Sequence, residues 1–340
     1  MLSFENDYIE GACEEILRRL LETNYEQLPG YGQDRYSLSA AEKIRGACAC
    51  PGADVFLLSG GTQTNAAVLA ALMSPYEGVI AAETGHVSTH EAGAIEYTGH
   101  KVLTLPQREG KLDADELNNY VNQFYADPGY PHMVQPGAVY ISQATEYGTV
   151  YSLRELEALS AVCRRHALPL YLDGARLGCA LAARDADMTF ADVARLCDAF
   201  YIGGTKNGAL CGEAVVFPNG APAHFFTTVK QHGALLAKGR LLGVQFDVLF
   251  TDDLYLRLAR HAVDMAERME RGLRAKGCEF YVDTTTNQKF PVLDAEGLSR
   301  LEKAAAYTLW ERLPDGRSVV RLAASWATRP EDVDLLIELM

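Results

Sequence analysis

The sequence has no long apolar run: no stretch of roughly 18 apolar residues, the length a helix needs to cross a bilayer, occurs in it. Residues 1–7 contain no Lys or Arg and lead into no apolar segment, so no secretory signal is expected. We therefore expect a protein that neither spans a membrane nor is exported by a signal.

Paired cysteines and an excess of basic residues are also missing. None of the eight cysteines stands in a C-x-x-C pair, so neither a zinc ribbon nor a disulfide framework is indicated, and a reducing cytoplasm is expected. Lys and Arg number 31 against 45 Asp and Glu, a formal net charge of −14. Such a surface repels phosphate backbones and anionic lipid. We expect neither nucleic acid nor membrane as a partner.

Short apolar runs recur along the first two thirds of the 340 residues. The chain is 48% hydrophobic and 22% charged, an ordinary globular balance. The runs have the length of strands buried on both faces: 55–58, 79–82, 101–105, 138–142, 170–172, 199–202 and 214–217. Helical stretches separate most of them, including 64–73, 113–124 and 153–166. This alternation predicts an α/β fold with a mostly parallel, seven-stranded sheet. A short glycine-rich link joins the last two runs and favours an antiparallel or edge position.

The pattern changes after about residue 246. A long helix is expected over 252–276, followed by an apolar run at 280–282, a helix from 298, a run at 319–322 and a closing helix from 331. We interpret this part as a small α+β domain (246–340) beside a large domain (1–245). The large domain begins with an arm, a helix over 9–23 and a glycine–tyrosine loop, that covers either domain or a neighbouring subunit.

Open α/β sheets bind ligands at the carboxyl ends of their strands, and four expected strands end in unusual polar segments. The run 55–58 is followed by Ser-Gly-Gly-Thr-Gln-Thr-Asn (59–65), which opens a helix. Glycines admit close backbone approach and a helix start offers free N–H groups, so the segment suits an anion. The alternative is a tight turn with a capping threonine. The segment is neither a Walker A motif nor G-x-G-x-x-G.

Two further strand ends carry an acid and an amine. Asp173 follows the run 170–172, where a buried carboxylate needs a cation or a proton donor; a local ion pair with Arg176 or a turn cap is the alternative. Lys206 follows the run 199–202 among small residues. Desolvation there lowers the pKa of an amine and makes it nucleophilic, although a surface lysine in a glycine-rich loop is the commoner case.

The fourth segment, 83–91, holds His86 and His90 four residues apart. The acid of H-E-x-x-H is absent and no third ligand is placed, so we expect no metal. An imidazole that stacks on a ring or acts as a base fits better. One cofactor accounts for all four segments, pyridoxal phosphate, which needs a phosphate cradle, a ring-stacking group, a carboxylate for its pyridinium nitrogen and an amine for its aldehyde.

Five motifs in this order carry a resemblance that runs nearly end to end: SGGTQTN (59–65), ETGHVSTHEAGA (83–94), YLDGARL (171–177), GGTKNGALCGE (203–213) and VVRLAASWAT (319–328). The sequence resembles the threonine aldolase and β-eliminating lyase family of pyridoxal phosphate enzymes. This resemblance implies an aspartate aminotransferase-like fold. It also implies a homodimer or homotetramer whose sites are completed at the subunit interface.

The resemblance also implies roles for particular residues. Lys206 would bond to the cofactor's aldehyde, Asp173 would pair with the pyridine nitrogen and His86 would stack on the ring. The residues implied at the phosphate are Gly61, Thr62 and Thr205. The residues implied at the substrate are Arg176, which also borders the cofactor's 3-oxygen, then Arg321, Asn6, Tyr31 and Lys238, with Arg240 as an alternative to Lys238.

The segment Thr145-Glu146-Tyr147-Gly148 departs from the family, because many members carry T-H-N-G there. A carboxylate is therefore expected to face the substrate's β-hydroxyl. The implied reaction is retro-aldol cleavage of L-threonine-like β-hydroxy-α-amino acids to glycine and an aldehyde, with His86, His90 and Glu146 as candidate bases. A β-eliminating lyase or aminotransferase acting on another amino acid, and a cofactor-binding protein without efficient lyase activity, remain as alternatives.

Overall fold

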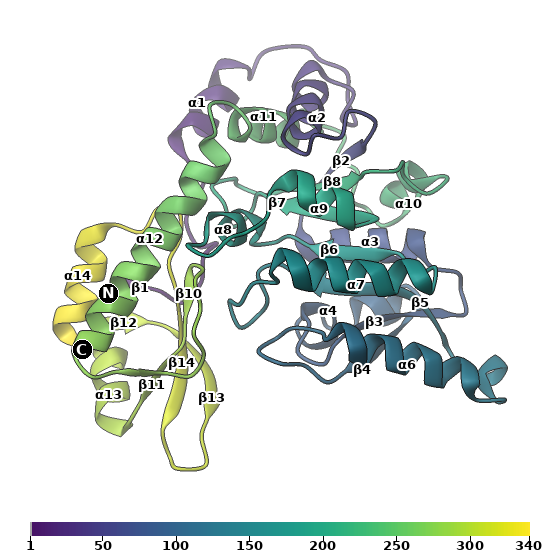
Figure 1. Ribbon diagram of the computed structural model, residues 1–340. Helices are drawn as coiled ribbons and strands as arrows, with labels where there is room; N and C mark the ends of the chain where they lie inside the picture. Colours follow the sequence, from purple (N-terminus) through teal and green to yellow (C-terminus); the bar gives the residue numbers. More distant parts are fainter. Residues whose placement is uncertain (1) are drawn as a thin grey trace.

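A seven-stranded sheet forms the centre of the larger part of the computed structural model, which describes residues 2–340 (Figure 1). All seven expected strands are present: β2 (Asp54–Leu58), β3 (Glu77–Ala82), β4 (Lys101–Leu105), β5 (Gln135–Ser142), β6 (Leu170–Asp173), β7 (Ala199–Gly203) and β8 (Glu213–Phe217). Their spatial order is β2-β8-β7-β6-β5-β3-β4. β8 pairs antiparallel with both neighbours and the other pairs are parallel, so the predicted α/β layout is confirmed, with β8 inside the sheet and not at its edge.

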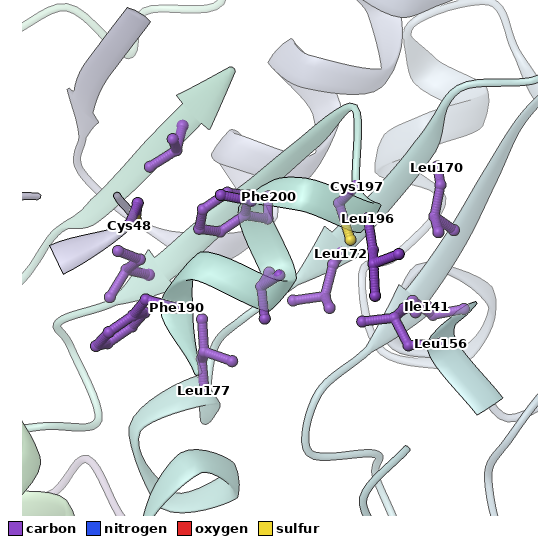
Figure 2. Packing of buried hydrophobic residues seen from close by; sticks show 14 of the residues in the cluster. Cys48, Ile141, Leu156, Leu170, Leu172, Leu177, Phe190, Leu196, Cys197 and Phe200 are labelled. Carbon is purple, nitrogen blue, oxygen red and sulfur yellow. The ribbon is translucent and has the colours of Figure 1, made fainter. Parts of the chain in front are cut away.

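Helices cover both faces of this sheet. The residues of one buried cluster come from the first face and from α6 (Ala114–Ala126), α7 (Leu153–Arg165), α8 (Leu177–Ala182) and α9 (Phe190–Leu196). Figure 2 shows part of it, where Leu172 of β6 lies near Phe200 of β7 and Leu196 of α9. The opposite face is covered by α3 (Gly61–Leu72), α5 (Ala94–Tyr97) and α10 (Phe225–Gln231). The sheet is therefore buried on both sides, as its continuous apolar runs predict.

The remaining helices of this part lie around the sheet. They are α1 (Glu14–Glu22), α2 (Arg35–Ala47), α4 (His86–Thr89), the short 3₁₀ helix η1 (Tyr130–His132) and α11 (Arg240–Leu249). Helices α2 and α11 pack against each other and add Ile44 and Phe246 to the first buried cluster. The expected division of the chain after residue 245 falls inside α11 and stays a prediction.

The C-terminal part is built on an antiparallel sheet. Its elements are α12 (Leu254–Ala275), β9 (Glu279–Phe280), β10 (Gln288–Lys289), β11 (Pro291–Leu293), α13 (Ala295–Ala304), β12 (Ala305–Ala306), β13 (Thr308–Arg312), β14 (Ser318–Ala323) and α14 (Pro330–Leu339). The central strand β14 pairs with β10, β11 and β13. The expected long helix, the strand at 319–322 and the closing helix are confirmed, whereas of the run 280–282 only Phe280 lies in a strand, β9. No helix within residues 2–340 combines the length and hydropathy of a membrane span.

The N-terminal arm contacts both parts of the chain. β1 (Leu2–Ser3) pairs in parallel with β12, and Phe4 is buried in the C-terminal cluster. Three residues later, Asp7 pairs with Arg176, just beyond the end of β6. Ile16 of α1 is then buried in the large cluster on the sheet. The arm thus ties the antiparallel sheet to the edge where the parallel strands end.

Candidate active site

A cavity lies at the carboxyl ends of the parallel strands, where the arm crosses them. Eight of the expected residues line it: Gly61, Thr62, His86, Glu146, Asp173, Arg176, Thr205 and Lys206. A second cavity adjoins it, since Tyr8, His86, Glu146, Arg176 and Lys206 line both, and it adds Asn6, His90 and Arg321. The structure therefore brings together every expected site residue except Tyr31 and Lys238.

Asp173 ends β6 as a buried carboxylate surrounded by hydrogen-bond donors. Its Oδ1 accepts from the Tyr201 hydroxyl at 2.5 Å, and its Oδ2 accepts from the Tyr140 hydroxyl at 2.6 Å and from Asn65 Nδ2 at 3.0 Å. Burial raises the pKa of Asp173, but the charge of His86 and these hydrogen bonds outweigh burial and hold the pKa below its usual range. Asp173 is thus a fixed anion, suited to a pyridinium nitrogen.

Arg176 does not pair with Asp173, so the expected local ion pair is wrong, whereas the turn-cap alternative is present: Asp173 Oδ1 accepts from the backbone N–H of Ala175 at 3.0 Å. Nε and a terminal nitrogen of Arg176 instead donate to Asp7 at 2.6 and 3.0 Å, and Asn287 donates to the same carboxylate at 2.9 Å. Burial raises the pKa of Asp7, but Arg176 outweighs it and holds the pKa far below its usual range. Because this pair is almost fully buried, the arm is locked to the cavity wall through two opposite charges.

Lys206 lies in the loop after β7 and lines both cavities. No hydrogen bond or ion pair connects its Nζ to any of residues 2–340; its cation–π contact is with the ring of Tyr8, at 5.8 Å. Burial lowers the pKa of Lys206, and the charge of Arg176 adds to that effect. A half-buried amine with a lowered pKa and no partner is available as a nucleophile.

His86 begins α4 and is held by a residue that sequence reasoning left without a role. Its Nδ1 lies 2.7 Å from Oε1 of Glu91, which also accepts from Asn65 at 2.7 Å. The His86 and His90 rings stack with centroids 5.7 Å apart. Burial lowers the pKa of His86, but the hydrogen bond with Glu91 and the charges of Asp173 and Glu91 together outweigh burial, so the pKa is raised. Glu91 and Asn65 lie inside two of the motifs of the sequence, 83–94 and 59–65. Their contacts could not be read from those segments, because Asn65 bonds to both Glu91 and Asp173, which are distant in sequence.

Glu146 places a carboxylate in the cavity, where the sequence departs from the family. Its Oε1 accepts from the Ser142 hydroxyl at 2.8 Å and from the backbone N–H of His86 at 3.0 Å. Its Oε2 is buried and has no hydrogen-bond partner among the described residues. Burial raises the pKa of Glu146, although the bond from Ser142 opposes the shift. An unpartnered buried oxygen beside a cavity is a site for a substrate group.

Arg321 of β14 enters the second cavity from the C-terminal part. One terminal nitrogen donates to Asn6 Oδ1 at 2.9 Å, and its buried Nε has no partner within residues 2–340. Its guanidinium lies 6.0 Å from the ring centroid of Trp310, a neighbour on β13. Such a planar, incompletely paired fork suits a carboxylate.

The opposite end of the first cavity presents backbone N–H groups. α3 begins at Gly61, and the first N–H groups of a helix have no intrahelical acceptor. A Cβ on Gly61 would lie 3.2 Å from the Tyr201 hydroxyl and would press against the group that donates to Asp173. The hydroxyl of Thr205 borders the same cavity. This end suits a phosphate group.

Tyr31 and Lys238 lie away from both cavities. Tyr31 lines a separate apolar groove with Phe226 and contacts Lys230, whose Nζ is 4.8 Å from its ring centroid. Lys238 is exposed and lines neither cavity. Arg240, the alternative to Lys238, donates to backbone carbonyls at the end of α1 and beyond it, including that of Glu26 at 2.8 Å.

The family model described as beta-eliminating lyase matches residues 4–296. The chain belongs to this family. The low specificity L-threonine aldolase of Pseudomonas aeruginosa is 34% identical over 338 residues, which cover 97% of this chain and 94% of that protein. A solved structure of Leishmania major threonine aldolase is 42% identical, with a TM-score of 0.95 over 100% of this chain and 98% of that one.

The fold has a wider resemblance. A Thermus thermophilus aspartate aminotransferase structure gives a TM-score of 0.72 at 16% identity, covering 100% of this chain and 90% of the other. At that identity the match concerns the fold alone, and it confirms the aspartate aminotransferase-like fold expected from the motifs. Membership of the beta-eliminating lyase family, also inferred from those motifs, is confirmed by the family model.

Proposed function

We propose that the protein is a pyridoxal phosphate-dependent lyase that cleaves L-threonine-like β-hydroxy-α-amino acids to glycine and an aldehyde by a retro-aldol reaction. The observation that carries this proposal is one cavity lined by the unpartnered amine of Lys206, the anionic Asp173 and the unpartnered oxygen of Glu146. The Pseudomonas aeruginosa and Leishmania major relatives carry the name threonine aldolase, which supports this substrate class.

The residues present fit the cofactor. The start of α3 and Thr205 would hold its phosphate, Asp173 its ring nitrogen, and Lys206 its aldehyde carbon, while His86 would lie on the ring. When bound, pyridoxal phosphate withdraws electrons from the α-carbon of an amino acid attached to it. The protein's share of the chemistry is then to orient the substrate and to move one proton.

Two arginines provide the orientation. Arg321 keeps Nε unpartnered at the cavity, and Arg176 is fixed by Asp7, so both hold positive charge where a substrate carboxylate would lie. Lys238 lines neither cavity of its own chain, so it would add positive charge only to the cavity of a neighbouring copy. A carboxylate held at this end leaves the β-hydroxyl free to point toward Glu146.

Glu146 is the base that the geometry favours among the three candidates. In the reaction the Cα–Cβ bond breaks, its electron pair stays with Cα, and the hydroxyl proton leaves as the C=O bond forms. Glu91 holds His86 Nδ1, and the Thr89 hydroxyl lies 2.6 Å from His90 Nδ1, so each imidazole has only its Nε2 left to accept a proton. Oε2 of Glu146 has no competing partner and can accept the proton.

Product analysis tests this function against its alternatives. The protein supplied with pyridoxal phosphate should release an aldehyde and glycine from L-threonine, L-allo-threonine or L-phenylserine. Pyruvate and ammonia from serine or cysteine without any aldehyde would instead establish a β-eliminating lyase, and amino transfer to a 2-oxo acid would establish an aminotransferase. A bound cofactor without turnover would indicate a binding protein.

We also propose a cytoplasmic homodimer or homotetramer in which Tyr31 and Lys238 border the cavity of a neighbouring copy. Leu38 is 57% exposed and lines the same apolar groove as Tyr31. All eight cysteines are free thiols, which supports a reducing compartment. Sedimentation should show a multimer in the active preparation, and a fully active monomer would contradict the proposal.

A further inference from the structure

A buried carboxyl group at the phosphate end of the cavity has no part in the reaction derived above. Glu213 begins β8 and pairs across the sheet with Leu58, the residue directly before Ser59 and the start of α3. Neighbouring strands lie about 5 Å apart, so this carboxyl is close to the expected phosphate cradle. Glu213 is only 4% exposed, and it lines the same cavity as Thr62 and Lys206.

Glu213 uses the same hydroxyl that the phosphate requires. Its Oε1 accepts from the Thr205 hydroxyl at 2.8 Å and its Oε2 accepts from the backbone N–H of Gly204 at 3.1 Å. The Thr205 oxygen itself accepts from the N–H of Gly212 at 3.1 Å. A hydroxyl has one proton to donate, so Thr205 donates either to an ionised Glu213 or to a phosphate oxygen.

The surrounding charges do not neutralise an ionised Glu213. Lys206 is the cation that faces it and Asp173 is a nearby anion, while the Cys211 thiol and the hydroxyls of Tyr171, Tyr201 and Tyr255 stay neutral because their pKa values are raised. Burial raises the pKa of Glu213 to about 8, against the hydrogen bond from Thr205 and the charge of Lys206. A second anion in the same buried space raises the cost of ionising Glu213 further.

We propose that Glu213 is a phosphate-site residue that carries a proton whenever the cofactor's phosphate is bound, so that phosphate binding and proton uptake by this carboxyl are coupled. The protonated group no longer needs the Thr205 hydroxyl, which is released to the phosphate. This inference rests on the proposed function only in taking the cofactor's phosphate as the anion. It concerns binding and not cleavage.

The coupling has a definite pH window. Below about pH 7 the Glu213 carboxyl of the cofactor-free protein is already protonated, so phosphate binding is accompanied by the uptake of only a small fraction of a proton. Above about pH 8 the proton must come from solvent, and the phosphate contribution to affinity falls by up to about tenfold per pH unit. Glu213→Gln keeps a neutral group of the same shape and removes this dependence.

Calorimetric titration of the cofactor-free protein measures the proton count. Pyridoxal phosphate and pyridoxal are titrated in buffers of different ionisation enthalpy at about pH 7 and 9. Both ligands form the same bond with Lys206, so the difference between them reports the phosphate. We expect pyridoxal phosphate to take up nearly one proton more than pyridoxal at pH 9, and much less than one at pH 7. Glu213→Gln should abolish this difference. Glu146→Gln is the matched control, since it removes a buried carboxyl at the other end of the cavity, and it should keep the wild-type difference.

Equal proton counts for the two ligands at pH 9 in the wild-type protein would overturn the inference, whether or not the Gln variant folds. A wild-type difference retained in Glu213→Gln would overturn it as well, because a group other than Glu213 would then take up the proton when the phosphate binds. A protein that shows the coupling but cleaves no hydroxy-amino acid would instead overturn the proposed function and leave this inference in place.

Discussion

At the residue scale, the predictable part of the site is the part that follows a strand. Asp173, Lys206 and the glycines before α3 could be found because buried strands leave a sequence signal and ligands bind where they end. Glu91, Asn65 and Glu213 could not be given roles, because their hydrogen bonds to one another, to His86 or to Thr205 form only once the helices and loops are folded. The neighbours of a carboxylate decide its chemistry, and one sequence does not list them.

Replacing the proposed base tests the reaction at this scale. Glu146→Gln removes the proton acceptor and keeps the shape, so kcat/KM for L-threonine should fall by about 10²- to 10⁴-fold while the absorbance of the bound cofactor is unchanged. Ser142→Ala, which leaves the carboxylate in place and removes a hydroxyl bonded to Oε1 of Glu146 and to the Tyr140 hydroxyl, should cost far less. Full activity of the Gln variant would assign the proton to another group.

The raised pKa of Glu146 predicts the acidic limit of activity. Burial raises this pKa, and the base works only when ionised, so the rate should fall as pH decreases through a value above the ordinary glutamate range. A profile of kcat/KM against pH measures where activity falls on the acidic side. A fall at the ordinary glutamate pKa would contradict the environment found for this carboxyl.

The Glu91 contact predicts the charge state of His86. Glu91→Gln removes the hydrogen-bonded anion that raises the pKa of His86, so the pKa should fall, because burial then dominates. Histidine resonances followed by NMR against pH, in the wild-type protein and the variant, measure the change. An unchanged His86 titration would show that Asp173 alone sustains its charge.

At the element scale, long elements are predicted well and short ones are not. The seven core strands carry continuous apolar runs, and α7 and α12 carry a clear helical apolar period. β10 has two residues, too few to show a period. No element was predicted over α2, because its buried face is made largely of small residues; its clearest start signal is Asp34, which accepts from the N–H groups of Tyr36 and Ser37.

That cap gives a prediction for α2. Asp34→Ala should lower the free energy of unfolding by about 1 to 2 kcal/mol, since Asp34 is buried and also accepts from the Ser37 hydroxyl at 2.7 Å. Asp113 caps α6 in the same way in a more exposed place, so Asp113→Ala should cost less. Urea unfolding compares the two, and equal losses would mean that the buried bond to Ser37 contributes nothing.

At the scale of the whole molecule, the sequence indicates two parts but not how the arm joins them. Phe4 is buried in the C-terminal cluster and Asp7 pairs with Arg176 at the parallel sheet, contacts made by residues hundreds of positions apart. Local patterns do not encode such distant partners. The arm also explains why Asn6 and Arg321 meet at the second cavity.

Removing the anchor of the arm should weaken the whole structure. Phe4→Ala should cost about 3 to 5 kcal/mol of unfolding free energy, because a fully buried ring is lost. Ile9→Ala, a change in the same arm at a residue that is 47% exposed, should cost about 0.5 kcal/mol or less. Urea titration of both variants is the measurement. A loss of unfolding free energy as small as that of Ile9→Ala would show that the contact of Phe4 with the C-terminal cluster does not stabilise the structure.

The most direct test of the proposed lyase is the stoichiometry of products from L-threonine. The protein with pyridoxal phosphate should release acetaldehyde and glycine in equal amounts, and Lys206→Ala should abolish both while leaving the circular dichroism spectrum unchanged. Undiminished release by the Lys206→Ala variant, or no aldehyde from any β-hydroxy-α-amino acid with the wild-type protein, would contradict the account.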